Sequence, residues 1–83
     1  MKQYSELVLS ELVSRLKQAR LQKGMSHDVL AQKAGVSRPA ISHIENGKRK
    51  PSLILCIKLA RALDVKLSDI IADIEKRSPA ISE

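Results

Sequence analysis

The sequence is almost without aromatic residues, since it contains one tyrosine and neither tryptophan nor phenylalanine. Its apolar residues are mainly leucine, isoleucine, valine and alanine, a supply that suits short packed helices better than a β-sandwich. With 83 residues the chain has room for one small hydrophobic core. The scarcity of aromatic residues therefore favours a single all-α domain.

Other absences argue against whole classes of protein. A single cysteine, Cys56, cannot form an internal disulfide and fits a reducing cytoplasm. No apolar run approaches the roughly 18 residues of a membrane span, and the first residues lack a signal-peptide core. No glycine-rich phosphate loop, catalytic triad or metal-ligand spacing is visible. We therefore expect a cytoplasmic protein that is not an enzyme, with no cofactor, metal, membrane or small-molecule partner.

Positive charge is concentrated in the middle of the chain. The formal net charge is +6, and residues 12–61 hold eleven lysines and arginines against two acidic residues, Asp28 and Glu45. The segments on either side are slightly acidic. This distribution fits a solvated basic surface as well as a polyanionic partner, and charge alone leaves both open.

Apolar residues that recur every three or four positions predict five helices and no strand. We expect them at about 5–22, 26–35, 37–47, 52–63 and 67–76. Their ends carry the residue types that favour helix termini. These are N-cap serines at Ser26, Ser37 and Ser52, a first-turn Pro39, terminal glycines at Gly24, Gly35 and Gly47, and a stop at Ser78 and Pro79.

Two adjacent short helices in the middle of the chain have the composition of a helix-turn-helix. Ala31 is small where a second helix would cross, and Gly35 permits the positive φ of a tight turn. Val36 fills the corner, while Ile41 and Ile44 hold the second helix against the first. Two short helices joined by a brief turn containing glycine define this motif. The whole set, inside a basic all-α domain, is a strong signal.

The sequence resembles the Cro/lambda-repressor-like, or Xre-type, helix-turn-helix family over about residues 12–74. The stretches RLKQARLQKGMS, LAQKAGVSRPAISHIENGKRKPS and IKLARALDVKLSDII fit that pattern. The resemblance implies a compact five-helix lambda-repressor-like DNA-binding domain at 12–76, an N-terminal extension of its first helix at 1–11, and a C-terminal tail at 77–83. It also implies a transcriptional regulator, such as a repressor, that binds double-stranded operator DNA as a homodimer.

Under that resemblance, residues 38–45 form the recognition helix that enters the major groove. Arg38 is suited to a forked contact with guanine O6 and N7, with a phosphate contact as the alternative. For His43, a solvated or phosphate-facing position is as compatible as base reading. The candidate base-contacting residues are Ser37, Arg38, Pro39, Ser42 and His43. The candidate phosphate-contacting residues are Ser26, His27, Asn46, Lys48, Arg49 and Lys50.

Three further residues bear on how the recognition helix is held. Arg20 and Glu45 match family residues that form a partly buried salt bridge between the first and third helices. His27 stands where the family commonly has glutamine. That departure keeps a phosphate contact open and weakens the case for a side-chain brace onto the third helix.

The fourth helical segment is apolar nearly all round, which suggests burial on two sides. Family members usually have polar residues just after Ser52, where this chain has Ile54 and Leu55. Leu53 and Ile57 are assigned to the core side. Either the core is larger than usual or a partner covers the second side, and we favour the partner. The candidate dimer-interface residues are Ile54, Leu55, Ile70, Ile71 and Ile74.

The main alternative is a protein-interaction module, such as an antitoxin whose main partner is a protein and which autoregulates its operon. Few residues follow Arg77, and we expect them to be too few for a substantial wrapping arm. A phage-type repressor and a restriction-modification controller both remain open. The operator sequence, and whether the protein represses or activates, cannot be read from the chain.

Overall fold

Five helices account for most of the chain in the computed structural model, which describes residues 3–77. They are α1 (Tyr4–Gln22), α2 (His27–Ala34), α3 (Arg38–Glu45), α4 (Leu53–Ala62) and α5 (Leu67–Arg77), and no strand occurs in this part of the chain. The all-α prediction is confirmed. The expected stop at Ser78 and Pro79, and nearly all of the expected tail, lie outside the described residues.

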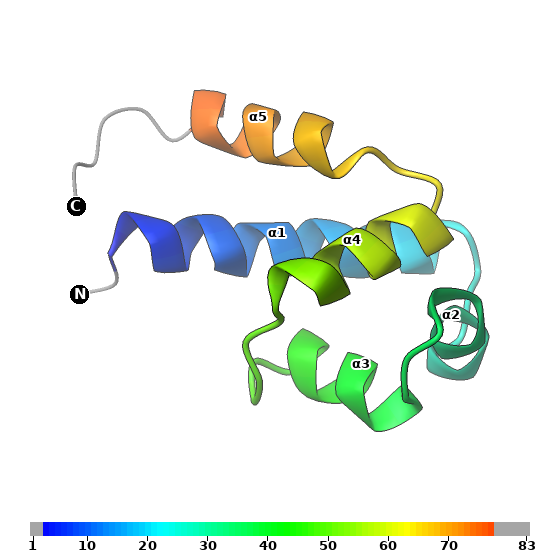
Figure 1. The fold of residues 1–83 in the computed structure, drawn as a ribbon. Helices are drawn as coiled ribbons and strands as arrows, with labels where there is room; N and C mark the ends of the chain where they lie inside the picture. The colour runs from blue at the N-terminus through cyan, green and yellow to red at the C-terminus, as the bar shows by residue number, and fades with distance from the viewer. Residues whose placement is uncertain (1–2, 78–83) are drawn as a thin grey trace.

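The long helix α1 organises the fold. Figure 1 shows α5 lying antiparallel beside α1, while α3 sits at the opposite edge of the molecule with α2 and α4 near it. The Tyr4 hydroxyl, at the start of α1, donates to Glu75 of α5 at 3.3 Å. Farther along α1, Arg15 Nη1 lies 2.8 Å from Asp73 Oδ2. These contacts fasten α5 to α1 and leave α3 on a separate edge. None of the helices described is long and apolar enough to cross a membrane.

Three serines begin the helices that surround the recognition region. Ser26, Ser37 and Ser52 each adopt an extended backbone conformation at the N-cap position of α2, α3 and α4. Each hydroxyl oxygen accepts a hydrogen bond from the backbone N–H three residues later, at 3.1, 3.3 and 3.1 Å respectively. A cap of this kind contributes about 1 kcal/mol, because it satisfies an N–H that has no partner within the helix.

The turn between α2 and α3 depends on Gly35. Its φ of +70° places it in the left-handed region, where a side chain is strained. This conformation lets the Val36 N–H return to the Ala31 carbonyl at 3.0 Å and ends α2. The helix α3 then begins only three residues after Gly35, at Arg38. The predicted tight corner is therefore present.

One hydrophobic core is assembled from all five helices. Leu63, Ile41, Leu30 and Ile74 are the most completely buried large side chains, and they come from or adjoin four different helices. Ile41 and Ile44 hold α3 inward, as the sequence indicates. The other buried apolar residues of this cluster are Leu12, Leu16, Ala31, Ala34, Leu55, Cys56, Leu59 and Ala60.

The orientation of α4 differs from the prediction. Leu55 lies in the core, whereas Leu53 and Ile54 are each 67% exposed and Ile57 is 43% exposed. The inward face follows the spacing of Leu55, Cys56, Leu59, Ala60 and Leu63. Since α4 turns by about 100° per residue, Leu53 and Ile57 fall outside this inward face. The assignment of Leu53 and Ile57 to the core was wrong, and so was the assignment of Leu55 to the outer surface.

Candidate nucleic-acid interface

The outer face of α3 is accessible along its length. Ser37, Arg38, Pro39 and His43 are exposed, and Ser42 is half-buried. Positions 38 and 42, and positions 39 and 43, are four residues apart, so their side chains lie on one face. The opposite face, with Ala40, Ile41 and Ile44, is buried against the core. The structure therefore brings the five candidate base-contacting residues to one side of one short helix.

Arg38 makes only a weak contact within the chain. Its Nε lies 3.5 Å from Asp28 Oδ1, and the two side chains are 65% and 74% exposed. An exposed ion pair of this kind is worth about 0–1 kcal/mol and is further weakened by salt. The guanidinium is therefore available to another hydrogen-bond acceptor at small cost.

The last turn of α3 orders its own polar side chains. The Asn46 amide donates to the Ser42 hydroxyl at 3.4 Å. Asn46 is exposed, and an amide group has a second N–H to offer. Ser42 therefore reaches the outer face less freely than its neighbours, a restriction that the sequence does not show.

The basic loop after α3 is fixed to the end of that helix by backbone hydrogen bonds. The N–H groups of Lys48 and Arg49 donate to the His43 carbonyl at 2.8 and 3.2 Å. Gly47 makes this reversal with a φ of +76°. The side chains of Lys48, Arg49 and Lys50 are exposed, and Lys50 Nζ lies 3.8 Å from Glu6. Three cationic side chains are thus carried on an anchored backbone next to α3.

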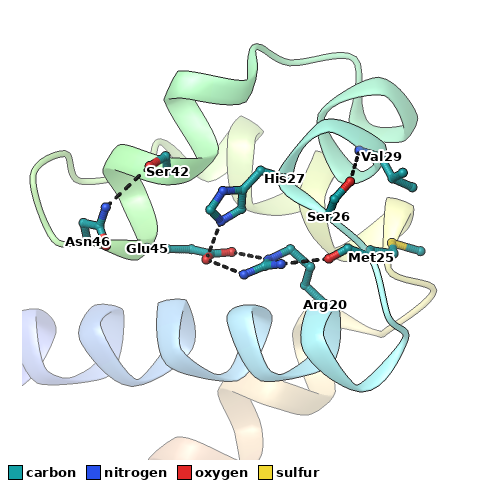
Figure 2. Close-up of polar contacts among 8 residues, drawn as sticks. All are labelled: Arg20, Met25, Ser26, His27, Val29, Ser42, Glu45 and Asn46. Atoms are coloured by element: carbon teal, nitrogen blue, oxygen red, sulfur yellow. Dashed lines mark hydrogen bonds and ion pairs between the residues drawn. The ribbon is translucent and has the colours of Figure 1, made fainter.

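A buried polar cluster joins the three helices behind this surface (Figure 2). The Arg20 guanidinium of α1 donates two hydrogen bonds to the Glu45 carboxylate of α3, from Nε at 2.8 Å and from Nη2 at 2.9 Å. Its Nη1 donates to the Met25 carbonyl at 2.8 Å. Both charged side chains are less than one tenth exposed. The ion pair implied by the resemblance is therefore present, in the two-pronged form that Arg–carboxylate geometry favours.

His27 completes the cluster from α2. Its Nε2 lies 3.0 Å from Glu45 Oε1, and its side chain is 29% exposed. The doubt about a brace onto the third helix was therefore misplaced, because imidazole nitrogen can replace a glutamine amide as donor. The sequence did not reveal this, since a histidine at a helix start is as compatible with a solvated ring.

The protonation of Glu45 follows from its neighbours. Burial alone disfavours the charged carboxylate, but the hydrogen bonds from Arg20 and His27 outweigh it and lower the pKa of Glu45 below its usual range. The carboxylate is thus ionised at neutral pH. One carboxylate then links α1, α2 and α3.

No group of side chains that suits a metal ion is brought together in the described part of the chain. No three His, Cys, Asp or Glu side chains among residues 3–77 form a group that suits a metal ion. Cys56 is buried in the core, and burial raises the pKa of its thiol. The thiol is thus a packing group rather than a reactive one.

Comparison with known proteins agrees with this geometry. The family model "Helix-turn-helix" matches residues 16–70. An uncharacterized HTH-type transcriptional regulator of Archaeoglobus fulgidus is 39% identical over 57 residues, covering 69% of this chain and 81% of the relative. The control protein C.MunI of Mycoplasma sp is 38% identical over 64 residues, covering 76% and 86%. The chain belongs to the Xre/Cro-type helix-turn-helix family.

Solved structures extend the likeness of this helix-turn-helix protein to its whole fold. The restriction-modification controller protein C.AhdI from Aeromonas hydrophila superposes with a TM-score of 0.68 at 36% identity, covering 81% of this chain and 98% of that one. The wild-type restriction-modification controller protein C.Esp1396I gives a TM-score of 0.71 at 28% identity, covering 80% and 88%. The five-helix fold and the DNA-binding regulatory function follow from these relatives. The family as a whole consists of transcriptional regulators.

Proposed function

We propose that this helix-turn-helix regulator reads a palindromic operator as a homodimer, with α3 in the major groove. The observation that supports this most directly is the outer face of α3. It is exposed and polar, it is held from behind by the Glu45 cluster, and it continues into an anchored loop with three cations. A helix presented in this way fits the width of the B-DNA major groove.

The residues divide by the chemistry they offer to DNA. Arg38, Ser37 and His43 near the outer face of α3 face the base edges, and Arg38 is the main candidate for a forked contact with guanine. The cations of the loop 48–50 contact phosphates, which adds affinity for any sequence. Ser26 and His27, at the N-terminus of α2, place backbone N–H groups toward a second phosphate. Pro39 stiffens the start of α3, while Ser42 and Asn46 support it with their mutual hydrogen bond.

The outer side of α4 is the proposed surface for a second copy of the chain. Three large apolar side chains are exposed on one face of this helix, those of Leu53, Ile54 and Ile57. Leu55 and Ile74 are withdrawn from the interface because both are core residues of the single chain. Ile70 and Ile71 are half-buried and pack against the core, so they contribute at most an edge. A two-fold dimer would place the recognition helices about 34 Å apart, one turn of DNA.

We further propose that the protein acts in the cytoplasm as a control protein of a restriction-modification system. The names of C.MunI, C.AhdI and C.Esp1396I support this context over an antitoxin, because each is named as a control or controller protein. Neighbouring genes for a nuclease and a methyltransferase would agree with the proposal.

Selection of bound sequences from random duplex DNA tests this function. We expect an inverted repeat with half-site centres one helical turn apart, bound by a dimer in sedimentation analysis. Recovery of unrelated sequences, or no enrichment over the starting pool at low salt, would contradict it.

A further inference from the structure

An acidic side chain lies beside the arginine that is proposed to read guanine. Asp28 belongs to the first turn of α2, and Arg38 is the first residue of α3. The distance from Asp28 Oδ1 to Arg38 Nε is 3.5 Å, so the pair bridges the two helices of the helix-turn-helix. Among residues 3–77 it is the only ion pair that Arg38 makes.

The position of Asp28 is unfavourable for binding DNA in general. It is one of two acidic residues in the segment 12–61, which holds eleven lysines and arginines. The other, Glu45, is buried, whereas the Asp28 side chain is 74% exposed. An exposed carboxylate on a DNA-binding surface repels phosphates and lowers the affinity for any duplex. The dipole of α2 favours an acid in its first turn but does not require one beside Arg38.

The atom that Asp28 approaches determines what the guanidinium still offers. An arginine side chain carries N–H donors on Nε and on both Nη atoms. Because the carboxylate pairs with Nε, the N–H groups of Nη1 and Nη2 make no ion pair within residues 3–77. A pair of parallel donors is what O6 and N7 of guanine accept in the major groove. The contact with Asp28 therefore leaves the forked end of Arg38 free for a base.

This contact is weak in the free protein and gains strength in a complex with DNA. The Arg38 side chain is 65% exposed, and water and salt weaken its attraction to Asp28. Insertion of α3 into the major groove would displace much of that water, and the attraction rises as the effective dielectric constant falls. An arginine already held at Nε also loses less conformational freedom when it binds a base.

We infer that Asp28 is a specificity-determining residue, whose carboxylate holds Arg38 at Nε while Nη1 and Nη2 of that arginine contact guanine. The inference rests on the proposed function, because it needs α3 in the major groove. Asp28 is a positioning residue, since it acts through Arg38 and does not contact the base itself. Its charge lowers the affinity for random DNA, while its contact with Arg38 raises the preference for guanine.

The test compares the affinities for three duplexes by fluorescence anisotropy at pH 7 and constant ionic strength. The first carries the sequence selected from random DNA. The second has adenine in place of the guanine whose preference Arg38→Ala loses, and the third is a random duplex of equal length. Asp28→Asn should lower the ratio of the guanine to the adenine affinity by about fivefold, a coupling typical of residues in contact. It should bind the random duplex about twofold more tightly, because a negative charge is removed.

Asp69→Asn is the matched control. Asp69 is an exposed acid in the first turn of α5, which lies beside α1 and away from α3 (Figure 1). This variant removes the same charge and the same interaction with a helix dipole, so it should leave the preference for guanine unchanged. The double variant Asp28→Asn, Arg38→Ala should have the preference of Arg38→Ala alone, because the effect of Asp28 passes through Arg38.

An Asp28→Asn variant that keeps the wild-type preference for guanine would overturn the inference, even if it binds every duplex more tightly. A preference that Asp28→Asn still changes in the Arg38→Ala background would also overturn it, since Asp28 would then contact a base directly. A wild-type protein that enriches no sequence from random DNA would instead contradict the proposed function.

Discussion

Replacing Arg20 by methionine should lower the free energy of unfolding by about 3–5 kcal/mol, because it leaves a buried carboxylate without its cation. Glu45 is 8% exposed and accepts two of its three hydrogen bonds from Arg20, at 2.8 and 2.9 Å. His27 still donates the third, which places the expected loss near the lower end of the range. The Met25 carbonyl also loses its donor.

Urea unfolding at pH 7 measures this loss directly. In a domain of this size, a loss of 1 kcal/mol lowers the Tm by about 4–8 °C, so the Tm of Arg20→Met should be lower than that of the wild type by at least about 12 °C. The double variant Arg20→Met, Glu45→Leu should recover much of the stability, since removing both charges leaves no stranded carboxylate. A loss below about 1 kcal/mol for Arg20→Met, or a double variant less stable than the single one, would refute the reasoning.

The pH dependence of the free energy of unfolding tests the role of the same carboxylate independently. The folded-state pKa of Glu45 lies below its usual value of 4.5, so the folded state binds fewer protons than the unfolded chain. Its contribution is complete above the unfolded pKa and is lost as the pH falls through the folded one. Glu45→Gln should therefore be less stable than wild type at pH 7, by a margin that shrinks below about pH 4.5. An unchanged margin at pH 3 would contradict this.

Three further variants test the turn, the loop and the dimer surface. Gly35→Ala should cost about 1–2 kcal/mol in urea unfolding through its φ of +70° alone, because an added Cβ meets no atom within 4 Å. Lys48→Ala should lower affinity for specific and random DNA alike and reduce the slope of log K against log salt by about 0.9, whereas Lys66→Ala, in the α4–α5 connection, should leave that slope unchanged. Ile54→Glu should shift the sedimenting species from dimer to monomer, while Leu21→Glu, at another exposed apolar position on α1, should not. A dimer that survives Ile54→Glu would remove α4 from the proposed interface.

Much of the fold was predictable because local signals and the global arrangement agree. Serine caps, the Gly35 corner and the spacing of Ile41 and Ile44 each point to the same pair of helices. The phase of α4 was not predictable, since apolar residues occupy both of its sides. Only the packing of Leu55 against the core shows which side is inward.

The site was predictable to a lesser degree. The ion pair between Arg20 and Glu45 came from resemblance, not from spacing, because the residues are 25 positions apart in the chain. The His27 contact was missed because its ring turns inward to a carboxylate that only the folded chain brings near. Arg15 of α1 pairs with Asp73 of α5 and with Glu11, and its hydrogen bond to Asp73 helps to lower the pKa of that carboxyl. Contacts between distant helices depend on the assembled backbone and produce no periodic pattern in the sequence.

The central claim is that the outer face of α3 reads base edges, and the sequence preference of Arg38→Ala tests it most directly. Binding selections from random duplex DNA should be run in parallel for wild type, Arg38→Ala and Lys48→Ala. The account predicts that Arg38→Ala loses the preference for guanine at one position in each half-site, while Lys48→Ala keeps the wild-type motif with weaker binding. An Arg38→Ala motif identical to that of the wild type would contradict the account.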